Sequence, residues 1–220
     1  MDCNCYFCDG LFQINKKIGL ASDESIIYQN DNVFIVPDIA PVVEGHFLII
    51  TKLHWNSFAN VDDDTYASLE SAKEYLRCSV FKDKHILFFE HGAVRNNTAG
   101  ACINHAHMHI IPIPLDINID GFISTFVSSE KMEANKYSIR KCAKDKQPYI
   151  FYEIDRDRQW YYPVEYLPHQ FFRMMVNYHF SVKHYRWGEQ YETDKSKKLF
   201  ENTLKLGRRE IKKEIEVFIC

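Results

Sequence analysis

The sequence of 220 residues predicts an α+β fold, in which about five antiparallel strands form a sheet crossed by a helix, and a further hairpin and helices follow. Short apolar runs bounded by turn residues recur over the first half of the chain, as is typical of strands. Residues 62–80 have the period of an amphipathic helix. Residues 105–111 alternate histidine with apolar side chains, which predicts a strand with two different faces.

The predicted elements of the first half follow one another closely. Strands at residues 26–28 and 33–36 flank an Asn-Asp-Asn turn and are expected to form a hairpin. A third strand is predicted at 46–51, after two prolines that interrupt pairing. The helix at 62–80 opens with three aspartates, which suit a helix N-terminus. A fourth strand at 86–89 precedes the histidine-rich strand.

The pattern weakens after Pro114, where we expect an extension. No linker is evident, so the sequence predicts one domain at residues 1–115 with an extension at 116–220 that packs on it. The elements expected in the extension are a short helix near 122–126, a charged loop at 131–146, a second hairpin at 149–154 and 159–162, a helix after Pro168 and a charged helix at 194–216.

Composition limits the classes of function. The net charge of −3 makes no electrostatic case for an extended nucleic-acid or membrane surface. No apolar run approaches the roughly 20 residues of a membrane span. The seven cysteines are odd in number, and the N-terminus lacks the basic start and apolar run of a secretory signal. We therefore expect a cytoplasmic protein with reduced thiols.

The histidine-rich strand is the candidate for chemistry. A strand period of two places His105, His107 and His109 on one face, roughly 6.6 Å apart. Because histidine changes charge near neutral pH, such a row can hold a neutral nucleophile beside proton donors. A polar strand face that happens to be rich in histidine is the plain alternative, and His-x-His is also a common pair of metal ligands.

The run His-Ala-His-Met-His-Ile-Ile at 105–111 resembles in full the signature of the histidine triad (HIT) family of nucleotide hydrolases and transferases. The similarity extends to residues 38–41, to residues 45–54 and to the Cys5 and Cys8 pair, while residues 167–173 resemble an extension of some longer members. The resemblance implies a HIT-like fold and transfer of a nucleoside monophosphate through a covalent histidine intermediate.

The resemblance assigns four histidines to catalysis: His46, His105, His107 and His109. His107 matches the nucleophile, whose neutral nitrogen attacks the α-phosphorus and splits one hard displacement into two easier ones. His109 matches a donor to the α-phosphate oxygens. His46 matches a histidine suited to proton transfer with the leaving group.

The residues expected around the nucleotide are Phe7, Asp38, Ile39, Glu90, Gly100, Ala101 and Cys102. Asp38 matches an acid that binds the ribose hydroxyls, with Ile39 and Phe7 near the base. The loop 100–102 matches the backbone segment that cradles phosphate, where glycine lets the main chain approach closely. Glu90 stands where smaller members have a neutral amide near the phosphates.

Zinc is the only cofactor implied, and no organic cofactor is expected. In zinc-binding members the cysteine pair is completed by two histidines, which match His54 and His105 here. Together with Cys5 and Cys8 they would form a closed, tetrahedral structural site. Free N-terminal cysteines are the alternative.

The resemblance implies a phosphohydrolase acting on a nucleotide substituted at its α-phosphate, either a dinucleoside polyphosphate or a nucleoside phosphoramidate. The third histidine, His109, favours hydrolysis, because the branch that transfers to other acceptors resembles His-x-His-x-Gln. A nucleotidyltransferase and a slow-turnover nucleotide-binding regulatory protein stay open as alternatives. A homodimer is compatible with the family, because compact members pair two protomers into a continuous sheet.

Overall fold

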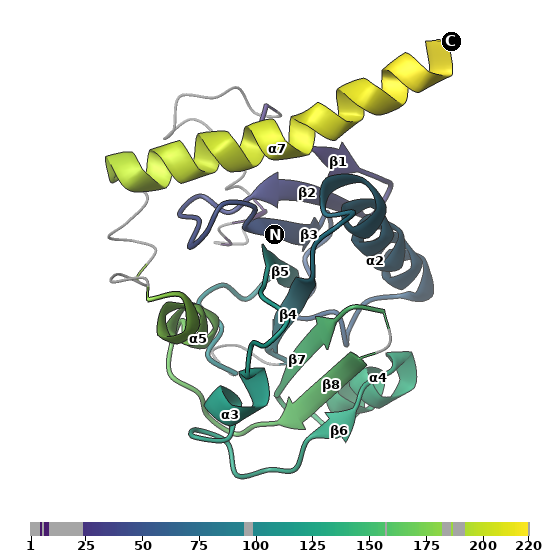
Figure 1. The fold of residues 1–220 in the computed structure, drawn as a ribbon. Coiled ribbons are helices and arrows are strands. Elements are labelled where there is room, and N and C mark those ends of the chain that lie inside the picture. Colours follow the sequence, from purple (N-terminus) through teal and green to yellow (C-terminus); the bar gives the residue numbers. More distant parts are fainter. Residues whose placement is uncertain are drawn as a thin grey trace.

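The computed structural model describes residues 5, 7–8, 24–94, 99–156, 158–181, 186 and 192–219, with side chains in the last segment up to residue 208. The described strands form one antiparallel sheet in the order β1-β2-β3-β5-β4-β7-β8-β6, with helices around it (Figure 1). The predicted α+β class is confirmed. The sheet has eight strands instead of about five, because the extension adds strands to it.

The first five strands lie close to the predicted ones, although β1 shares only Tyr28 with its predicted range of 26–28. They are β1 (Tyr28–Gln29), β2 (Val33–Pro37), β3 (Phe47–Thr51), β4 (Ile86–Gly92) and β5 (His107–Pro112). β1 and β2 form the predicted hairpin, and β5 lies between β3 and β4 in the middle of the sheet. His105 precedes β5 by two residues, so only two of the three alternating histidines belong to the strand.

The predicted second hairpin is confirmed, and it extends the sheet. β7 (Tyr149–Ile154) pairs with β4 along its six residues, and β8 (Arg158–Pro163) and β6 (Met132–Glu133) continue outward. Without β7 this edge of β4 would expose unpaired backbone groups. A Cβ on Gly92 would lie 2.2 Å from the Tyr149 ring, so this pairing requires glycine at the end of β4.

The expectation of a charged loop at residues 131–146 is wrong, because this segment contains β6 and the helix α4 (Lys136–Lys144). Asn135 and Ser138 form a capping box, in which each side chain accepts a hydrogen bond from the other residue's backbone N–H. The buried side chains of α4 are Ile139 and Cys142. Two apolar residues among many charges were too weak a pattern to indicate the helix from sequence.

The predicted helix at residues 62–80 is confirmed as α2 (Asp63–Tyr75), which continues into the π-helical segment η1 (Leu76–Val80). The side chain of Asp62 accepts a hydrogen bond from the N–H of Thr65 at 2.7 Å and caps the helix. α2 and α4 pack on one face of the sheet.

The opposite face is covered by α3 (Ile119–Ile123) and α5 (Phe171–Phe180). The long helix α7 (Asp194–Ile219) crosses the molecule near β1 and β2, and its N-terminal part points toward the side that carries α5 (Figure 1). Thr203 of α7 accepts a hydrogen bond from the N–H of Gly45 at 2.9 Å. No helix in the described segments is long and apolar enough to cross a membrane.

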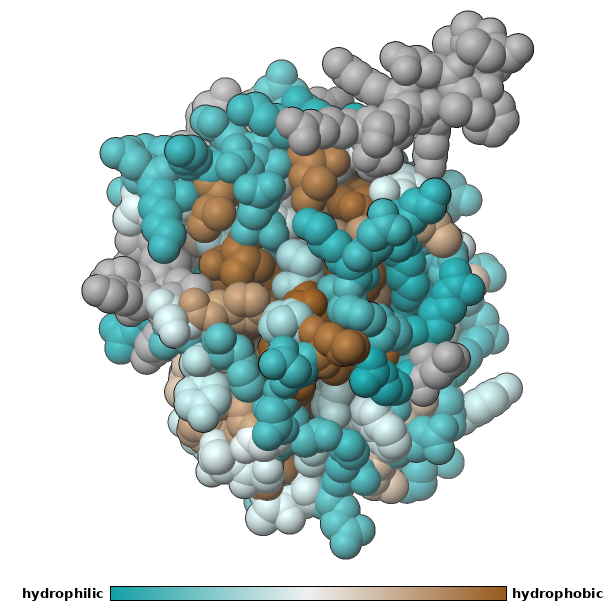
Figure 2. Space-filling view, viewed as in Figure 1, coloured by the Kyte–Doolittle hydropathy of each residue, from teal (hydrophilic) through white to brown (hydrophobic). Residues whose placement is uncertain are grey.

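Both large hydrophobic clusters contain residues from each side of residue 115. One joins Phe88 and Met108 to Phe151 in β7. The other joins Phe89 to Phe171 of α5. The extension therefore completes the core of the first half. On the face seen in Figure 2, hydrophobic residues gather in the middle and hydrophilic ones surround them.

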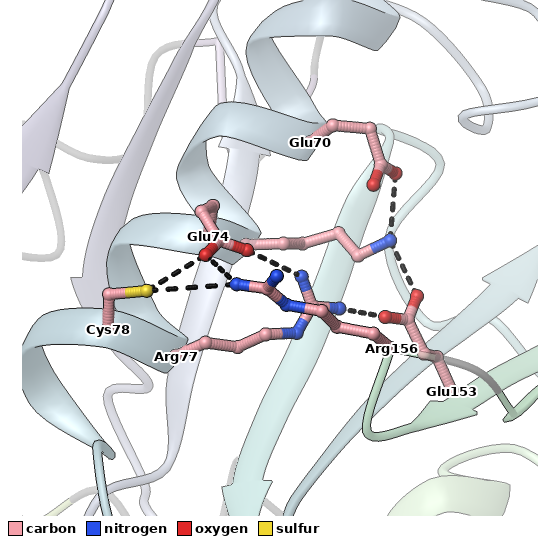
Figure 3. A network of polar contacts seen from close by, with 7 residues as sticks. Glu70, Glu74, Arg77, Cys78, Glu153 and Arg156 are labelled. Atoms are coloured by element: carbon pink, nitrogen blue, oxygen red, sulfur yellow. Dashed lines mark hydrogen bonds and ion pairs between the residues drawn. The ribbon is translucent and has the colours of Figure 1, made fainter.

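Charged side chains join α2 to β7 inside the protein (Figure 3). The Nζ atom of Lys73 lies 2.6 Å from Glu153 Oε2 and 2.8 Å from Glu70 Oε1. Arg77 pairs with the other oxygen of Glu153. Lys73 and Glu153 are fully buried, so each charge depends on its partners and ties a helix of the first half to a strand of the extension.

Candidate active site

A cavity lies on the sheet face that carries the side chains of His107 and His109, and residues of α5 and α7 border it. The sequence-predicted residues that line it are Phe7, Asp38, Ile39, Gly100, Cys102, His107 and His109. The extension contributes Gln170, Phe172, Arg173 and Phe200. The structure thus brings residues from both ends of the chain into one site.

His107 presents a lone pair to this cavity. Its Nδ1 lies 2.7 Å from the carbonyl oxygen of His105, so Nδ1 carries the proton and donates it. In the neutral ring Nε2 is then unprotonated. Burial lowers the pKa of His107, although the His105 carbonyl and the charge of Asp38 oppose the shift. The ring is therefore neutral and can act as a nucleophile.

His109 presents the opposite group, an N–H donor. The backbone N–H of Val42 donates to His46 Nδ1 at 3.3 Å, so the proton of neutral His46 sits on Nε2. His46 Nε2 lies 3.0 Å from His109 Nδ1 and donates to it, which leaves the proton of His109 on Nε2. The ring of Phe172 stacks on His109 at 4.3 Å and holds its plane.

Burial keeps both rings of this pair neutral. It lowers the pKa of His46 to about 4, against the opposing charge of Asp38. It also lowers the pKa of His109 well below its ordinary value, and the neighbouring histidines and Arg173 act in the same direction. The arrangement of a lone pair on His107 beside an N–H on His109 therefore holds at neutral pH.

Backbone amides add donors at the turn formed by residues 99–102. His91 Nδ1 donates to the carbonyl oxygen of Ala99 at 2.8 Å. The N–H of Gln170 donates to the carbonyl oxygen of Gly100 at 3.3 Å. Because the C=O and N–H of a trans peptide point in opposite directions, the N–H groups of Gly100 and Ala101 are turned away from these partners. Neither N–H has an acceptor among the described residues, so both are available to an anion.

The conformation of this turn explains its glycine. Gly100 has a φ of +70°, which glycine adopts without strain. A Cβ at this position would lie 2.6 Å from the carbonyl oxygen of Pro168 in the extension. The turn is thus fitted closely against the segment that leads into α5.

The carboxylate of Asp38 is bound by other residues of the protein. One carboxylate oxygen accepts hydrogen bonds from the N–H of Ala40 at 2.8 Å and from Arg173 at 2.6 Å. The other lies 3.6 Å from His46 Nε2. Burial raises the pKa of Asp38, but Arg173 and His46 outweigh it and hold the pKa below its usual value. Asp38 is therefore ionised and paired.

A second cluster of ligand-type atoms lies outside the cavity, formed by Cys5, Cys8, His54 and His105, all within 4.8 Å of one another. Cys8 Sγ is 3.2 Å from His54 Nδ1 and 3.5 Å from His105 Nδ1, and Cys5 Sγ is 3.4 Å from the same atom of His105. Sulfur and nitrogen ligands of tetrahedral zinc lie roughly 3.6 Å apart, so the set fits zinc. His105 Nε2 donates to the carbonyl of Thr51 at 2.8 Å, which leaves Nδ1 free to ligate.

The chain matches the HIT domain model over residues 20–114. An uncharacterised HIT-like protein of Methanocaldococcus jannaschii is 30% identical to it over 110 residues, which are 49% of this chain and 78% of that protein. This chain belongs to the HIT family. Protein hit of Bacillus subtilis is 31% identical over 116 residues, 50% of this chain and 70% of that protein. Adenylylsulfatase HINT3 of Arabidopsis thaliana is 31% identical over 113 residues, 50% of this chain and 52% of that protein.

Solved structures of HIT proteins resemble part of the chain. A HIT-like protein of Bartonella henselae superposes with a TM-score of 0.38 at 23% identity, over 54% of this chain and 85% of that one. A histidine triad protein of Clostridium difficile superposes with a TM-score of 0.38 at 20% identity, over 54% of this chain and 98% of that one.

One residue predicted for the HIT site is misplaced. Glu90 lies on the opposite face of β4, where its carboxylate accepts hydrogen bonds from the N–H of Phe58 and the hydroxyl of Tyr149, each at 2.7 Å. Burial raises the pKa of Glu90 to about 7. Glu90, which was predicted to border the nucleotide, does not line the cavity, because strand alternation turns His91 toward the cavity instead.

Three other predicted residues lie just behind the cavity lining. Ala101 is buried in the turn, and the group it offers to an anion is its backbone N–H. His46 is buried behind His109 and reaches the cavity only through that ring. His105 supports His107 through its carbonyl and turns its own ring toward the cysteine pair.

Sequence reasoning missed His91, Phe172 and Phe200 as lining residues. His91 could have been predicted, because it shares a face with Phe89 on β4, the strand next to the one that carries His107 and His109. Phe172 belongs to a segment whose resemblance to longer HIT members gave a partial signal. Phe200 gave a weak signal, because the many charges of its helix obscured the helical spacing of Phe200 and Leu204, which are both buried.

Proposed function

We propose that this HIT protein is a nucleotide phosphohydrolase that cleaves at the α-phosphate of a substituted nucleotide, through a covalent bond to His107. The supporting observation is the pair of opposed hydrogen-bonding states, a lone pair on His107 Nε2 beside an N–H on His109 Nε2. One group can attack phosphorus, and the other can stabilise the charge that grows on its oxygens.

The reaction has two displacements. In the first, His107 Nε2 bonds to the α-phosphorus while the bond to the leaving group breaks, and His109 and the amides of the 99–102 turn donate to the phosphate oxygens. The leaving group departs with the electrons of the broken bond and takes a proton from water, because the neutral His46 and His109 could give one up only by becoming an anion. In the second, water attacks phosphorus, loses a proton to the solvent, and releases the nucleoside monophosphate and the free imidazole.

The remaining cavity suits a nucleoside. Val36, Leu48 and Phe7 form an apolar cluster, with Ile39 packed against it, and Phe200 adds a further apolar side chain. Phe7 also contacts the edge of His107, with ring centroids 5.2 Å apart. A flat, uncharged base is the part of a nucleotide that gains most from burial between such side chains.

The charges of the site favour a substituted phosphate. Arg173 and Asp38 offset each other, and the cavity histidines are neutral, so phosphate binding depends on N–H donors. A phosphate carrying two substituents has one negative charge and is easier to bury than the dianion of a simple monoester. Dinucleoside polyphosphates and nucleoside phosphoramidates both have this feature. The name of the Arabidopsis relative, an adenylylsulfatase, also describes cleavage beside a nucleotide phosphate.

Trapping the intermediate tests this function. Protein mixed with members of a panel of both substrate classes is quenched in alkali within milliseconds and analysed by mass spectrometry, because a phosphorus–nitrogen bond to histidine is labile in acid. We expect a nucleotidyl adduct on His107 and release of the monophosphate. Adduct without release would support the slow-turnover regulator, transfer to a second nucleotide would support the transferase, and turnover without any adduct would contradict the mechanism.

We propose zinc as the ligand of Cys5, Cys8, His54 and His105. Four protein ligands leave no open position, so the metal would be structural and would join the N-terminal segment to the base of β5. It would also fix the segment that carries Phe7 against the cavity, because Phe7 lies between the two cysteines.

Removing both cysteines of this set should remove the metal. We expect about one zinc per chain in protein purified without chelator, and none in the Cys5→Ser/Cys8→Ser variant, which should also melt at a lower temperature. Elemental analysis and thermal denaturation measure both. Cys78→Ser, at an exposed cysteine outside the cluster, is the control and should keep the zinc. Metal-free wild-type protein with unchanged stability would contradict the proposal.

A further inference from the structure

Arg173 brings a buried positive charge from the extension into the active site. It lies in the first turn of α5 and is only 4% exposed. Its guanidinium donates to the carbonyl of Ala40 at 2.8 Å and to Asp38 at 2.6 Å. Burying an arginine is costly unless it is paired, and here both partners come from the loop before β3. The ion pair therefore joins two segments that are 135 residues apart.

Asp38 stands between this arginine and the imidazole pair. One of its oxygens faces Arg173, and the other is 3.6 Å from His46 Nε2 and 4.0 Å from His109 Nδ1. The guanidinium also argues against a cation held by Asp38, His46 and His109, because it already neutralises the one carboxylate. The carboxylate is thus positioned to favour protonation of the pair, and the arginine to oppose it.

We propose that Arg173 is a positioning residue that offsets Asp38, so that the His46–His109 pair stays neutral and His109 keeps its proton on Nε2, facing the phosphate. This inference rests on the proposed function for its catalytic meaning. A second proton on the pair would enter at His46 Nδ1, where the N–H of Val42 already points, and would break the arrangement that orients His109. An unopposed Asp38 would favour that proton.

The charged and titratable groups that face the pair come from each element packed against it. Asp38 and Arg173 face His46, and His107 and His91 face His109 from β5 and β4. Burial and Arg173 both lower the pKa of His46, while Asp38 raises it, as expected if Arg173 counteracts the carboxylate. Phe172 excludes water from the stacked face of His109.

Imidazole nitrogen NMR tests the proposal without any substrate. In the wild type we expect His46 and His109 to remain neutral from alkaline pH down to the acid limit of folding, with His109 protonated on Nε2. In Arg173→Gln the pair should take up a proton at a pH about one unit or more higher. In Asp38→Asn/Arg173→Gln, which lacks both charges, the shift should disappear.

Two further variants separate charge from packing. Arg173→Lys keeps the charge and should move the midpoint less than Arg173→Gln. Arg140→Gln is the matched control, because Arg140 also binds a carbonyl, that of Val61, and a carboxylate, that of Asp63, but away from the cavity. It should leave both histidines unchanged. If Arg173→Gln does not fold, Arg173→Lys is the deciding variant, because it keeps the charge without the paired contacts of the guanidinium, and an unchanged midpoint of the pair in this variant would contradict the proposal.

Three results would overturn the inference. They are a wild-type pair that is already protonated near neutral pH, an Arg173→Gln protein that titrates as the wild type does, and a shift that persists in the double variant. If turnover exists, the acid limb of the kcat/KM profile of Arg173→Gln should move to higher pH, whereas a purely structural loss would lower activity equally at all pH values. Absent turnover with the expected titration would contradict the proposed function and leave this inference supported.

Discussion

Replacing His107 with alanine should abolish turnover, by about a thousandfold or more, while nucleotide affinity stays within about tenfold of the wild type. The variant loses the atom that attacks phosphorus, whereas the donors on His109 and the 99–102 turn remain in place. Initial rates with the substrate panel and direct binding of the nucleoside monophosphate measure the two effects separately. His107→Asn should behave alike, because its amide cannot attack phosphorus.

The matched control is His85→Ala, which removes a half-exposed histidine that contacts Asp155 far from the cavity. It should leave turnover unchanged. More than a few per cent of wild-type turnover in purified His107→Ala protein would exclude covalent catalysis by this residue. A large loss of affinity in the same variant would instead indicate that His107 mainly binds the phosphate.

Local patterns predicted the central part of the site. The alternation at residues 105–111 determines which side chains share a face, so the amino-acid sequence alone was enough to place His107 and His109 together. The same rule explains why Glu90 does not line the cavity. A shift of one residue along a strand reverses the face, so of the neighbours Glu90 and His91 only His91 lies on the cavity side.

Contacts between distant segments could not be predicted in this way. The pairing of β7 with β4 and the bond from Arg173 to Asp38 depend on how the extension folds back, which no local period encodes. The sequence indicated an apolar face at 171–176 that must be covered. It did not indicate that the face would stack Phe172 on His109, nor that a charged residue beside it would be buried.

The buried charges between α2 and β7 lead to the largest expected effect on stability. Changing Glu153 to glutamine should lower the free energy of unfolding by about 3 kcal/mol, because the full charges of Lys73 and Arg77 would then face a neutral amide in the interior. Lys73 keeps one partner, the half-exposed Glu70, which limits the loss. Urea denaturation followed by circular dichroism measures the change.

A double variant shows whether the loss of stability comes from the buried, unpaired charge of Lys73. Lys73→Met/Glu153→Gln removes the buried lysine as well, so its stability should lie closer to the wild type than that of Glu153→Gln alone. Glu74→Gln is the control, because Glu74 is half-exposed where it pairs with Arg77 and Arg156, and such pairs contribute at most about 1 kcal/mol. Equal stability of Glu153→Gln and Glu74→Gln would mean that water reaches Lys73 and that these charges do not hold the extension to the first half of the chain.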